Sequence, residues 1–201
     1  MVQEQTGYPL VLKGELTEPL SRWLWLVKWF ILIPHVIVLF FLWLSAFIMW
    51  IISFFAILFT GKYPRPPFDF IVGVLRWTWR VNFYGYGALG TDKYPPFSFE
   101  AGGYPADLEV VYPEKLSRGL VLVKWWLLAI PHYIIVGIFQ RAFYIGLVFI
   151  LAIFGAIGLL FTGKYPKGIY DLVIGMNRWT FRVAGYAALT TDRYPPFRLS
   201  E

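Results

Sequence analysis

The chain has 201 residues, of which 58% are hydrophobic and 21% aromatic, and its formal net charge is +6. Only 15% of the residues are charged, against about a quarter in soluble domains, so the composition predicts an integral membrane protein. Cysteine is absent, which excludes disulfides, thiolate catalysis and cysteine-bound metal clusters. The basic residues flank apolar segments instead of forming one polar patch, so we expect no nucleic-acid partner.

Two apolar runs dominate the chain. Residues 36–59 are 24 residues without an ionisable side chain, which is long enough to span a bilayer, and a second run covers residues 142–161. Residues 1–19 are polar and mixed, without the apolar core of a secretory signal, so we expect no cleavable signal peptide. These runs predict a multi-pass membrane protein.

Most of the chain is a tandem duplication, because residues 20–97 return in the same order as residues 116–197. The recurring motifs are Ser21-Arg22 and Ser117-Arg118, Lys28-Trp29 and Lys124-Trp125, Ile33-Pro34-His35 and Ile130-Pro131-His132, Thr60-Gly61-Lys62-Tyr63-Pro64 and Thr162-Gly163-Lys164-Tyr165-Pro166, Arg76-Trp77-Thr78 and Arg178-Trp179-Thr180, and Thr91-Asp92 and Thr191-Asp192. We interpret residues 1–97 as the first repeat and residues 98–201 as the second. The duplication constrains topology but reveals no activity.

The spacing between the repeats predicts a bend within each apolar run. The offset grows from 97 at His35/His132 to 102 at Thr60/Thr162, and Gln140-Arg141 lies within this stretch of the second copy. Insertions are tolerated at loop tips, and a charge at the bilayer centre is costly. We therefore expect a transmembrane helical hairpin at about 22–60, with arms near 23–42 and 45–59, and another at about 118–162. The alternative is one tilted, kinked helix per repeat, followed by a second span near 70–89.

The hairpins place nearly all basic residues on one side of the membrane, including Arg22, Lys28 and Lys124, and leave Arg141 at the far tip. By the positive-inside rule, this side is cytoplasmic and holds both termini. An even number of crossings per repeat gives both copies the same orientation. The expected symmetry is a pseudo-two-fold axis along the membrane normal.

After each hairpin we expect an amphipathic helix lying in the membrane interface, at about 68–90 and about 170–190. Arginines four residues apart share a helix face, an acidic residue near the start complements the helix dipole, and Trp77 and Trp79 suit the headgroup zone. The polar residues concerned are Asp69, Arg76 and Arg80 in the first repeat and Asp171, Arg178 and Arg182 in the second.

A small cytoplasmic β-sheet is expected to join the halves. Residues 97–101, a Gly102-Gly103 turn and residues 108–112 predict a β-hairpin, to which residues 10–16 and 197–199 add short strands. The predicted fold is thus an all-α membrane protein with two tandem repeats and a small sheet from the termini and the linker.

The motifs resemble the bacterial membrane family catalogued as domain of unknown function 4389. The matching signature is Ser-Arg, Ile-Pro-His, Phe-Thr-Gly-Lys-Tyr-Pro, Arg-Trp with Arg-Val, and Thr-Asp-x-Tyr-Pro-Pro-Phe, and it occurs twice. The resemblance implies a prokaryotic cytoplasmic membrane as the setting. It implies no established activity.

His35 and His132 are the only histidines and occupy equivalent positions after a proline. Buried imidazoles in membrane proteins ligate haem or chlorophyll, which would make the pair a cofactor site. In the alternative interpretation, each ring bonds a backbone carbonyl freed by the adjacent proline. We favour the second interpretation and expect no cofactor.

The Gly-Lys motifs lack the full spacing of a phosphate-binding loop, so we expect Lys62 and Lys164 to meet anionic headgroups at a membrane-surface turn. The carboxylates and arginines of the two interfacial helices are expected to form a polar cluster under each hairpin. Such a cluster either grips a lipid phosphate or fixes the helix through ion pairs, and we favour the ion pairs.

No constellation typical of catalysis is present in the sequence, so we expect no enzyme. The 10 Trp and 19 Phe residues exceed what interface belts require and favour packing against partners. We therefore expect a non-catalytic accessory or scaffold subunit of a larger membrane complex, with lipids and other membrane subunits as partners. The alternative is a lipid-interacting protein that shapes or senses the bilayer, and a weaker one is haem or pigment binding through the histidines.

Overall fold

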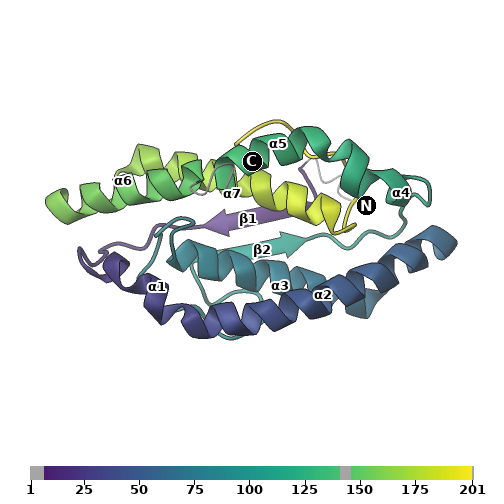
Figure 1. Ribbon diagram of the computed structural model, residues 1–201, viewed down its shortest axis with the longest axis horizontal. Helices are drawn as coiled ribbons and strands as arrows, with labels where there is room; N and C mark the ends of the chain where they lie inside the picture. Colours follow the sequence, from purple (N-terminus) through teal and green to yellow (C-terminus); the bar gives the residue numbers. More distant parts are fainter. Residues whose placement is uncertain (1–6, 141–145, 201) are drawn as a thin grey trace, which may run out of the picture.

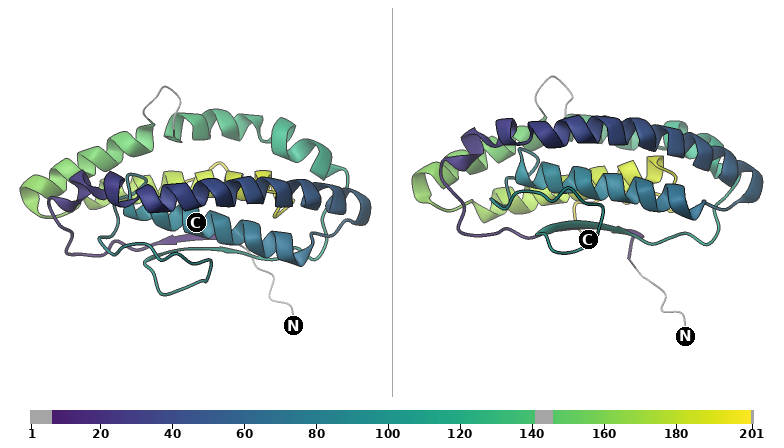
Figure 2. Two further views of the ribbon diagram at one scale, coloured as in Figure 1. Left: turned by 60° about the horizontal axis from the view of Figure 1, so that its bottom comes forward. Right: turned by 90° about the horizontal axis from the view of Figure 1, so that it is seen from below.

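The computed structural model describes residues 7–140 and 146–200, and the fold is mostly helical with one two-stranded sheet. Three layers are stacked (Figures 1 and 2). The sheet forms one face, two helices that are largely buried form the middle layer, and the apolar helices form the opposite face. The elements are β1 (Leu10–Gly14), η1 (Leu24–Leu26), α1 (Lys28–Ile31), α2 (Ile33–Thr60), α3 (Arg65–Tyr84), β2 (Ala106–Val110), α4 (Leu120–Val123), η2 (Lys124–Leu128), α5 (Ile130–Gln140), α6 (Leu147–Thr162) and α7 (Lys167–Ala187).

The outer helix of the first repeat, α2, is one continuous helix of 28 residues, so the predicted hairpin is wrong here. No glycine or proline interrupts residues 42–45, and Ser45 Oγ donates to the Phe41 carbonyl, one turn back in the same helix. The helix ends only at Gly61, whose φ of 71° is the left-handed conformation that glycine adopts readily. Among the described residues, α2 is the one unbroken helix that is long and apolar enough to cross a membrane.

In the second repeat, α5 and α6 together replace α2. They meet end to end in an arch (Figures 1 and 2), so the predicted antiparallel arms are wrong here too. Gln140 ends α5 as expected of a break, whereas Arg141 lies outside the described residues. The segment Leu120–Leu128 precedes α5 with a bend of 43°. The described part of this region thus consists of two helices in line, and it shows no pair of antiparallel arms.

The helices predicted after each apolar region are present as α3 and α7, but both are largely buried within the protein instead of lying on its surface. Trp77 is 6% exposed and Trp79 fully buried, because α3 is covered by α2 on one side and by the sheet on the other (Figure 2). The Arg76 and Arg80 side chains do share a face, as the spacing predicted, and that face meets β2.

The sheet pairs β1 with β2 in antiparallel register, with Leu12 opposite Leu108. Strands were predicted at both positions, but residues 97–101 and 197–199, which are described, form no strand. The backbone of 97–101 bonds to arginine side chains of α3 instead. The antiparallel pairing relates the repeats by an approximate two-fold axis through the centre of the sheet (Figure 1).

Each strand packs on the buried helix of one repeat, and the strand from the N-terminus packs on the helix of the second repeat. The strand β2 packs on α3 of the first repeat, whereas the N-terminal strand β1 packs on α7 of the second (Figure 1). The tyrosine of the Gly-Tyr-Pro motif before each strand fixes this arrangement. Tyr104 donates to the Lys93 carbonyl at 2.9 Å, and Tyr8 donates to the Arg193 carbonyl at 3.2 Å. The N-terminal strand therefore holds the two ends of the described chain together.

Candidate functional site

Both histidines are fully buried, and each packs within its own repeat. Trp77 Nε1 donates to His35 Nδ1 at 2.9 Å, and the imidazole stacks on Phe97 with ring centroids 3.9 Å apart. His132 repeats the arrangement with Trp179 at 2.9 Å. We expected each histidine to bond a backbone carbonyl, and this prediction is wrong for Nδ1, which accepts a hydrogen bond from a tryptophan indole. Three aromatic rings contact each imidazole, one of them stacked on it.

Replacing His35 with Phe is expected to lower the free energy of unfolding by about 1–3 kcal/mol, because the buried Trp77 indole N–H loses its acceptor. Denaturant unfolding in mild detergent, followed by tryptophan fluorescence, measures the change. The double variant that also replaces Trp77 with Phe is the control, since it removes both partners and should recover part of the loss. No recovery would contradict the assigned hydrogen bond.

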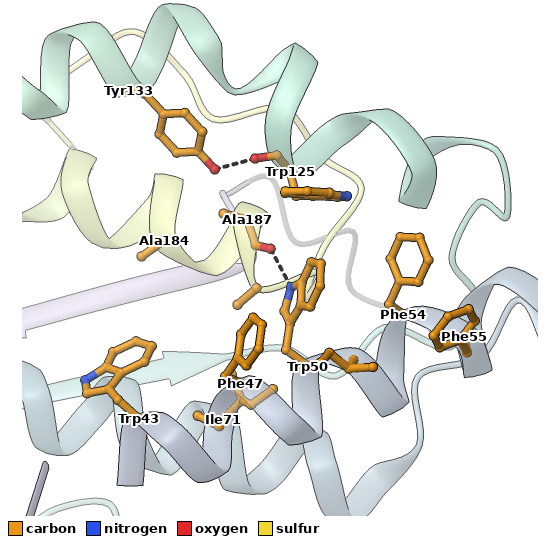
Figure 3. A pocket seen from close by; sticks show the side chains of 13 residues that line it. Trp43, Phe47, Trp50, Phe54, Phe55, Ile71, Trp125, Tyr133, Ala184 and Ala187 are labelled. Carbon is orange, nitrogen blue, oxygen red and sulfur yellow. Dashed lines mark hydrogen bonds between the residues drawn. The ribbon is translucent and has the colours of Figure 1, made fainter. Parts of the chain in front are cut away.

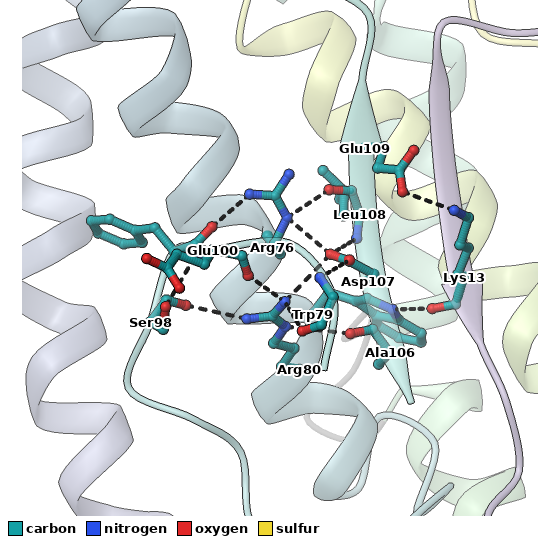
Figure 4. Close-up of polar contacts among 12 residues, drawn as sticks. Lys13, Arg76, Trp79, Arg80, Ser98, Glu100, Ala106, Asp107, Leu108 and Glu109 are labelled. Atoms are coloured by element: carbon teal, nitrogen blue, oxygen red, sulfur yellow. Dashed lines mark hydrogen bonds and ion pairs between the residues drawn. The ribbon is translucent and has the colours of Figure 1, made fainter. Parts of the chain in front are cut away.

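The predicted cluster of Asp69 with Arg76 and Arg80 does not form. Asp69 pairs with Arg65 at 3.0 Å on the exposed start of α3, and Asp171 likewise pairs with Lys167. The two arginines instead reach Asp107 of β2 (Figure 4), an acidic residue that the sequence analysis did not single out. The distances are 2.9 Å from Arg76 and 3.5 Å from Arg80.

Arg80 is 1% exposed and uses its guanidinium on the backbone. It donates to the carbonyls of Ala106, Ser98, Glu100 and Gly102, at 3.3, 3.3, 2.6 and 3.4 Å (Figure 4). Burial lowers the pKa of Arg80, and the nearby Asp107 carboxylate opposes that effect. In the second repeat, Arg182 donates to the carbonyls of Arg198 and Ser200. These arginines hold irregular backbone in place, which favours the structural interpretation over a phosphate grip.

A buried lysine in each repeat is a second feature that the sequence analysis missed. Lys28 Nζ lies 2.9 Å from Asp92 and donates to the Thr91 carbonyl at 2.6 Å. Lys124 makes the same pair with Asp192 at 2.7 Å. The sequence analysis counted both lysines among the basic residues on one side of the membrane and assigned them no partner, whereas they are 1% and 0% exposed and ion-paired. The sequence did contain one signal for these ion pairs, because both the lysine and the Thr-Asp motif recur in the second repeat.

Lys62 and Lys164 are exposed at the ends of the apolar helices, as expected of a surface turn. Each turn contacts an arginine of the other repeat. A Cβ atom added to Gly61 would lie 3.6 Å from Arg118 Nε, and one added to Gly163 would lie 2.7 Å from Arg22 Nη2. A lysine of one repeat and an exposed arginine of the other thus gather at each end of the long axis.

An apolar groove opens on the outer layer between α2 and the η2–α5 segment (Figure 3). Its volume is about 670 Å³. The residues lining it are Trp43, Ala46, Phe47, Trp50, Ile51, Phe54, Phe55, Ile71, Trp125, Tyr133, Ala184, Ala187 and Ala188. The sequence analysis did not predict a groove, because its two walls come from different repeats.

A family model described as Domain of unknown function (DUF4389) matches residues 21–98 and again residues 121–198. The two matches cover most of the chain and coincide with the duplication, and the chain therefore belongs to this family in two tandem copies. No curated protein matches the chain, and no solved structure does.

Proposed function

We propose that this two-copy DUF4389 chain is a non-catalytic, lipid-interacting protein that lies flat in one leaflet of a membrane. In this arrangement α2, α5 and α6 enter the hydrocarbon, and the sheet faces the water. The observation that carries the proposal is the layering, with the outer helices and the sheet on opposite faces (Figure 2). The outer helices expose apolar side chains, and the sheet exposes charged ones.

The apolar surface is far larger than a soluble protein exposes. Only a narrow stripe of α2 is buried, and the exposed large side chains cover the rest of its circumference. They are Ile33, Val36, Ile37, Phe40, Phe41, Trp43, Leu44, Phe47, Ile48, Ile51, Ile52, Phe55 and Phe59. Removing one such side chain from water contributes about 1.5–3 kcal/mol, so together they anchor the layer in lipid.

A crossing orientation conflicts with the position of the sheet. The strands lie beside the helices near the middle of the long axis (Figure 1), so a membrane normal along α2 would bring them to mid-bilayer depth. The sheet carries an exposed Lys13–Glu109 ion pair and the exposed Glu15, and charged side chains at that depth cost about 2.5–3.5 kcal/mol each. The flat orientation keeps these charges in water and sets the pseudo-two-fold axis along the membrane normal.

The cationic ends of the long axis support the choice of membrane face. Lys62 with Arg118 and Lys164 with Arg22 flank the apolar layer at its two ends. Basic residues next to apolar segments favour the cytoplasmic leaflet, whose lipids are partly anionic. We therefore propose the cytoplasmic face of a prokaryotic membrane, with residues 7 and 200 on the cytoplasmic side.

Single cysteines test this topology, because the native chain has none. In sealed vesicles, Glu15→Cys and Lys62→Cys are expected to react with an impermeant maleimide from the same side. Ser45→Cys, on the exposed face of α2, is expected to react from neither side until detergent is added. Labelling of Ser45→Cys from the opposite side would place residue 45 on the far membrane surface and contradict the flat orientation. Labelling of Lys62→Cys from the side opposite to Glu15→Cys would establish a crossing and overturn the flat orientation.

A second proposal is the accessory-subunit role, which the rigid aromatic side chains on the outer face of α2 favour, among them Phe40, Phe47 and Phe59. In that role the outer layer contacts the membrane helices of a partner complex. Purification from native membranes in mild detergent separates the two proposals. One set of partners at fixed ratio supports the accessory role, and lipid alone supports the first. A Soret band in the same preparation would support the weaker haem alternative.

A further inference from the structure

We propose that the groove between α2 and the η2–α5 segment holds one acyl chain of an anionic phospholipid, whose phosphate binds Lys62 and Arg118. This inference rests on the proposed seating in the membrane and deepens it by naming a lipid class and a site. It joins two features that belong to different repeats, namely the aromatic groove and the cationic turn at one end of it.

The chemistry of the groove suits hydrocarbon. Its lining (Figure 3) is almost entirely apolar. Of its four polar side-chain groups, only the Trp125 indole N–H has no partner among the described residues, and Trp43 Nε1 donates to Thr78 Oγ1 at 3.1 Å. Trp50 Nε1 donates to the Ala187 carbonyl at 2.9 Å, and the Tyr133 hydroxyl donates to the Trp125 carbonyl. A polar ligand would therefore find one free donor at most, and it would lose most of its hydrogen bonds to water without replacing them. The volume of about 670 Å³ is within the range of about 300–1,000 Å³ typical of small-molecule sites.

The groove opens on the layer that the proposed function places in lipid, so a bilayer acyl chain is the available occupant. The lining of the groove ends about two helical turns short of the charged turn. On α2, Phe55 lies six residues before Gly61, and on the facing segment, Trp125 lies seven residues after Arg118. The C-terminal end of α2 and α4 lie together at the same end of the molecule (Figure 1). One lipid can therefore reach both features.

The charges at this turn are complementary to a phosphate. Lys62 and Arg118 are both exposed, and within residues 7–140 and 146–200 neither forms an ion pair. An arginine and a lysine that converge on one phosphate form charge-assisted hydrogen bonds, which are roughly twice as strong as neutral ones. The site thus predicts a preference for an anionic headgroup over a zwitterionic one.

The opposite end of the molecule provides a matched control. Arg22 and Lys164 repeat the charged turn, but two of the aromatic residues that line the groove are missing there. The residues equivalent to Trp50 and Phe54 are Ala152 and Ala156, at the offset of 102 that holds for this part of the repeat. A charge change at this end therefore alters the same chemistry without touching the groove.

Native mass spectrometry of the whole protein in mild detergent tests the site. The probes are phosphatidylglycerol and phosphatidylcholine with the same chains. The wild type is expected to retain one phosphatidylglycerol in preference to phosphatidylcholine. Lys62→Gln with Arg118→Gln is expected to weaken phosphatidylglycerol binding about thirtyfold, as for two basic residues beside an anionic lipid. Arg22→Gln with Lys164→Gln should stay within about twofold, and Ala184→Phe, which fills the groove, should weaken both lipids.

Equal retention of the two lipids by the wild type would overturn the site, as would an equal loss in the two charge-pair variants. Flotation with vesicles of pure phosphatidylcholine separates this failure from that of the proposed function. If the wild type floats but shows no lipid preference, only the proposed lipid site is rejected. A wild type that does not float removes the membrane seating on which the site rests.

Discussion

Replacing Lys28 with Met is expected to lower the free energy of unfolding by about 3 kcal/mol. The lysine is 1% exposed, and its ammonium group neutralises Asp92 and binds the Thr91 carbonyl. Removing one partner of a buried pair leaves an uncompensated charge, which typically costs about 3–5 kcal/mol. Asp92 is 26% exposed and also accepts from the Ser21 backbone N–H, which places the loss at the lower end of that range.

Denaturant unfolding in mild detergent measures this loss, and the duplication supplies two comparisons. Lys124→Met removes the equivalent pair with Asp192 and should cost about as much. Lys62→Met changes the same residue type at an exposed position and should stay within about 0.5 kcal/mol. If Lys28→Met cost no more than Lys62→Met, the buried pair would contribute nothing to stability.

The repeated motifs predicted much of the architecture, because a duplicated sequence folds into duplicated contacts. The hydrogen bond from Trp77 to His35 recurs as Trp179 to His132, with 2.9 Å in both repeats. The helices after the apolar regions and the strand positions could likewise be inferred from local pattern. The local pattern did not predict that the N-terminal strand β1 packs on α7 of the second repeat. The contact of Tyr8 with Arg193 in this arrangement spans 185 residues of chain.

The hairpin prediction was wrong for a physical reason that the sequence contains only indirectly. It treated the bilayer as the one apolar environment available, so 28 apolar residues had to fold back or cross. A helix of that length is about 42 Å long, which exceeds a hydrocarbon core of about 30 Å. In the structure, α2 lies along α3, but α3 is recognisable as its packing partner only once the burial of α3 is known.

The candidate site was predicted in part. Lys62 and Lys164 were expected at a surface turn and lie there, whereas the arginine beside each comes from the other repeat. Lys28 was interpreted as a marker of membrane orientation, and Arg80 as part of the polar face of an interfacial helix. Their actual partners, Asp92 and Asp107, are 64 and 27 residues away along the chain, beyond the reach of helical spacing. Long-range pairing of this kind has no local signature.

Replacing Arg80 with Met is expected to have the largest effect in the chain, about 3–5 kcal/mol. Four backbone carbonyls lose their donor at once, and Asp107 keeps only Arg76 as a counter-ion. The segment 98–107 leads into β2, so its release weakens the sheet that joins the two repeats. Arg80→Lys keeps the charge but loses the fork of donors, and we expect it to recover only part of the stability.

The control for this variant is Arg65→Met on the same helix, which removes an exposed ion pair with Asp69 and should cost at most about 1 kcal/mol. Unfolding in detergent gives the stability, and protease cleavage within 98–105 reports whether this segment is released. If Arg80→Met matched Arg65→Met in both measurements, the backbone bonds of Arg80 would not be what holds the linker. A loss confined to Arg80→Met would mean that the joint between the repeats depends on a charge buried between α3 and the sheet.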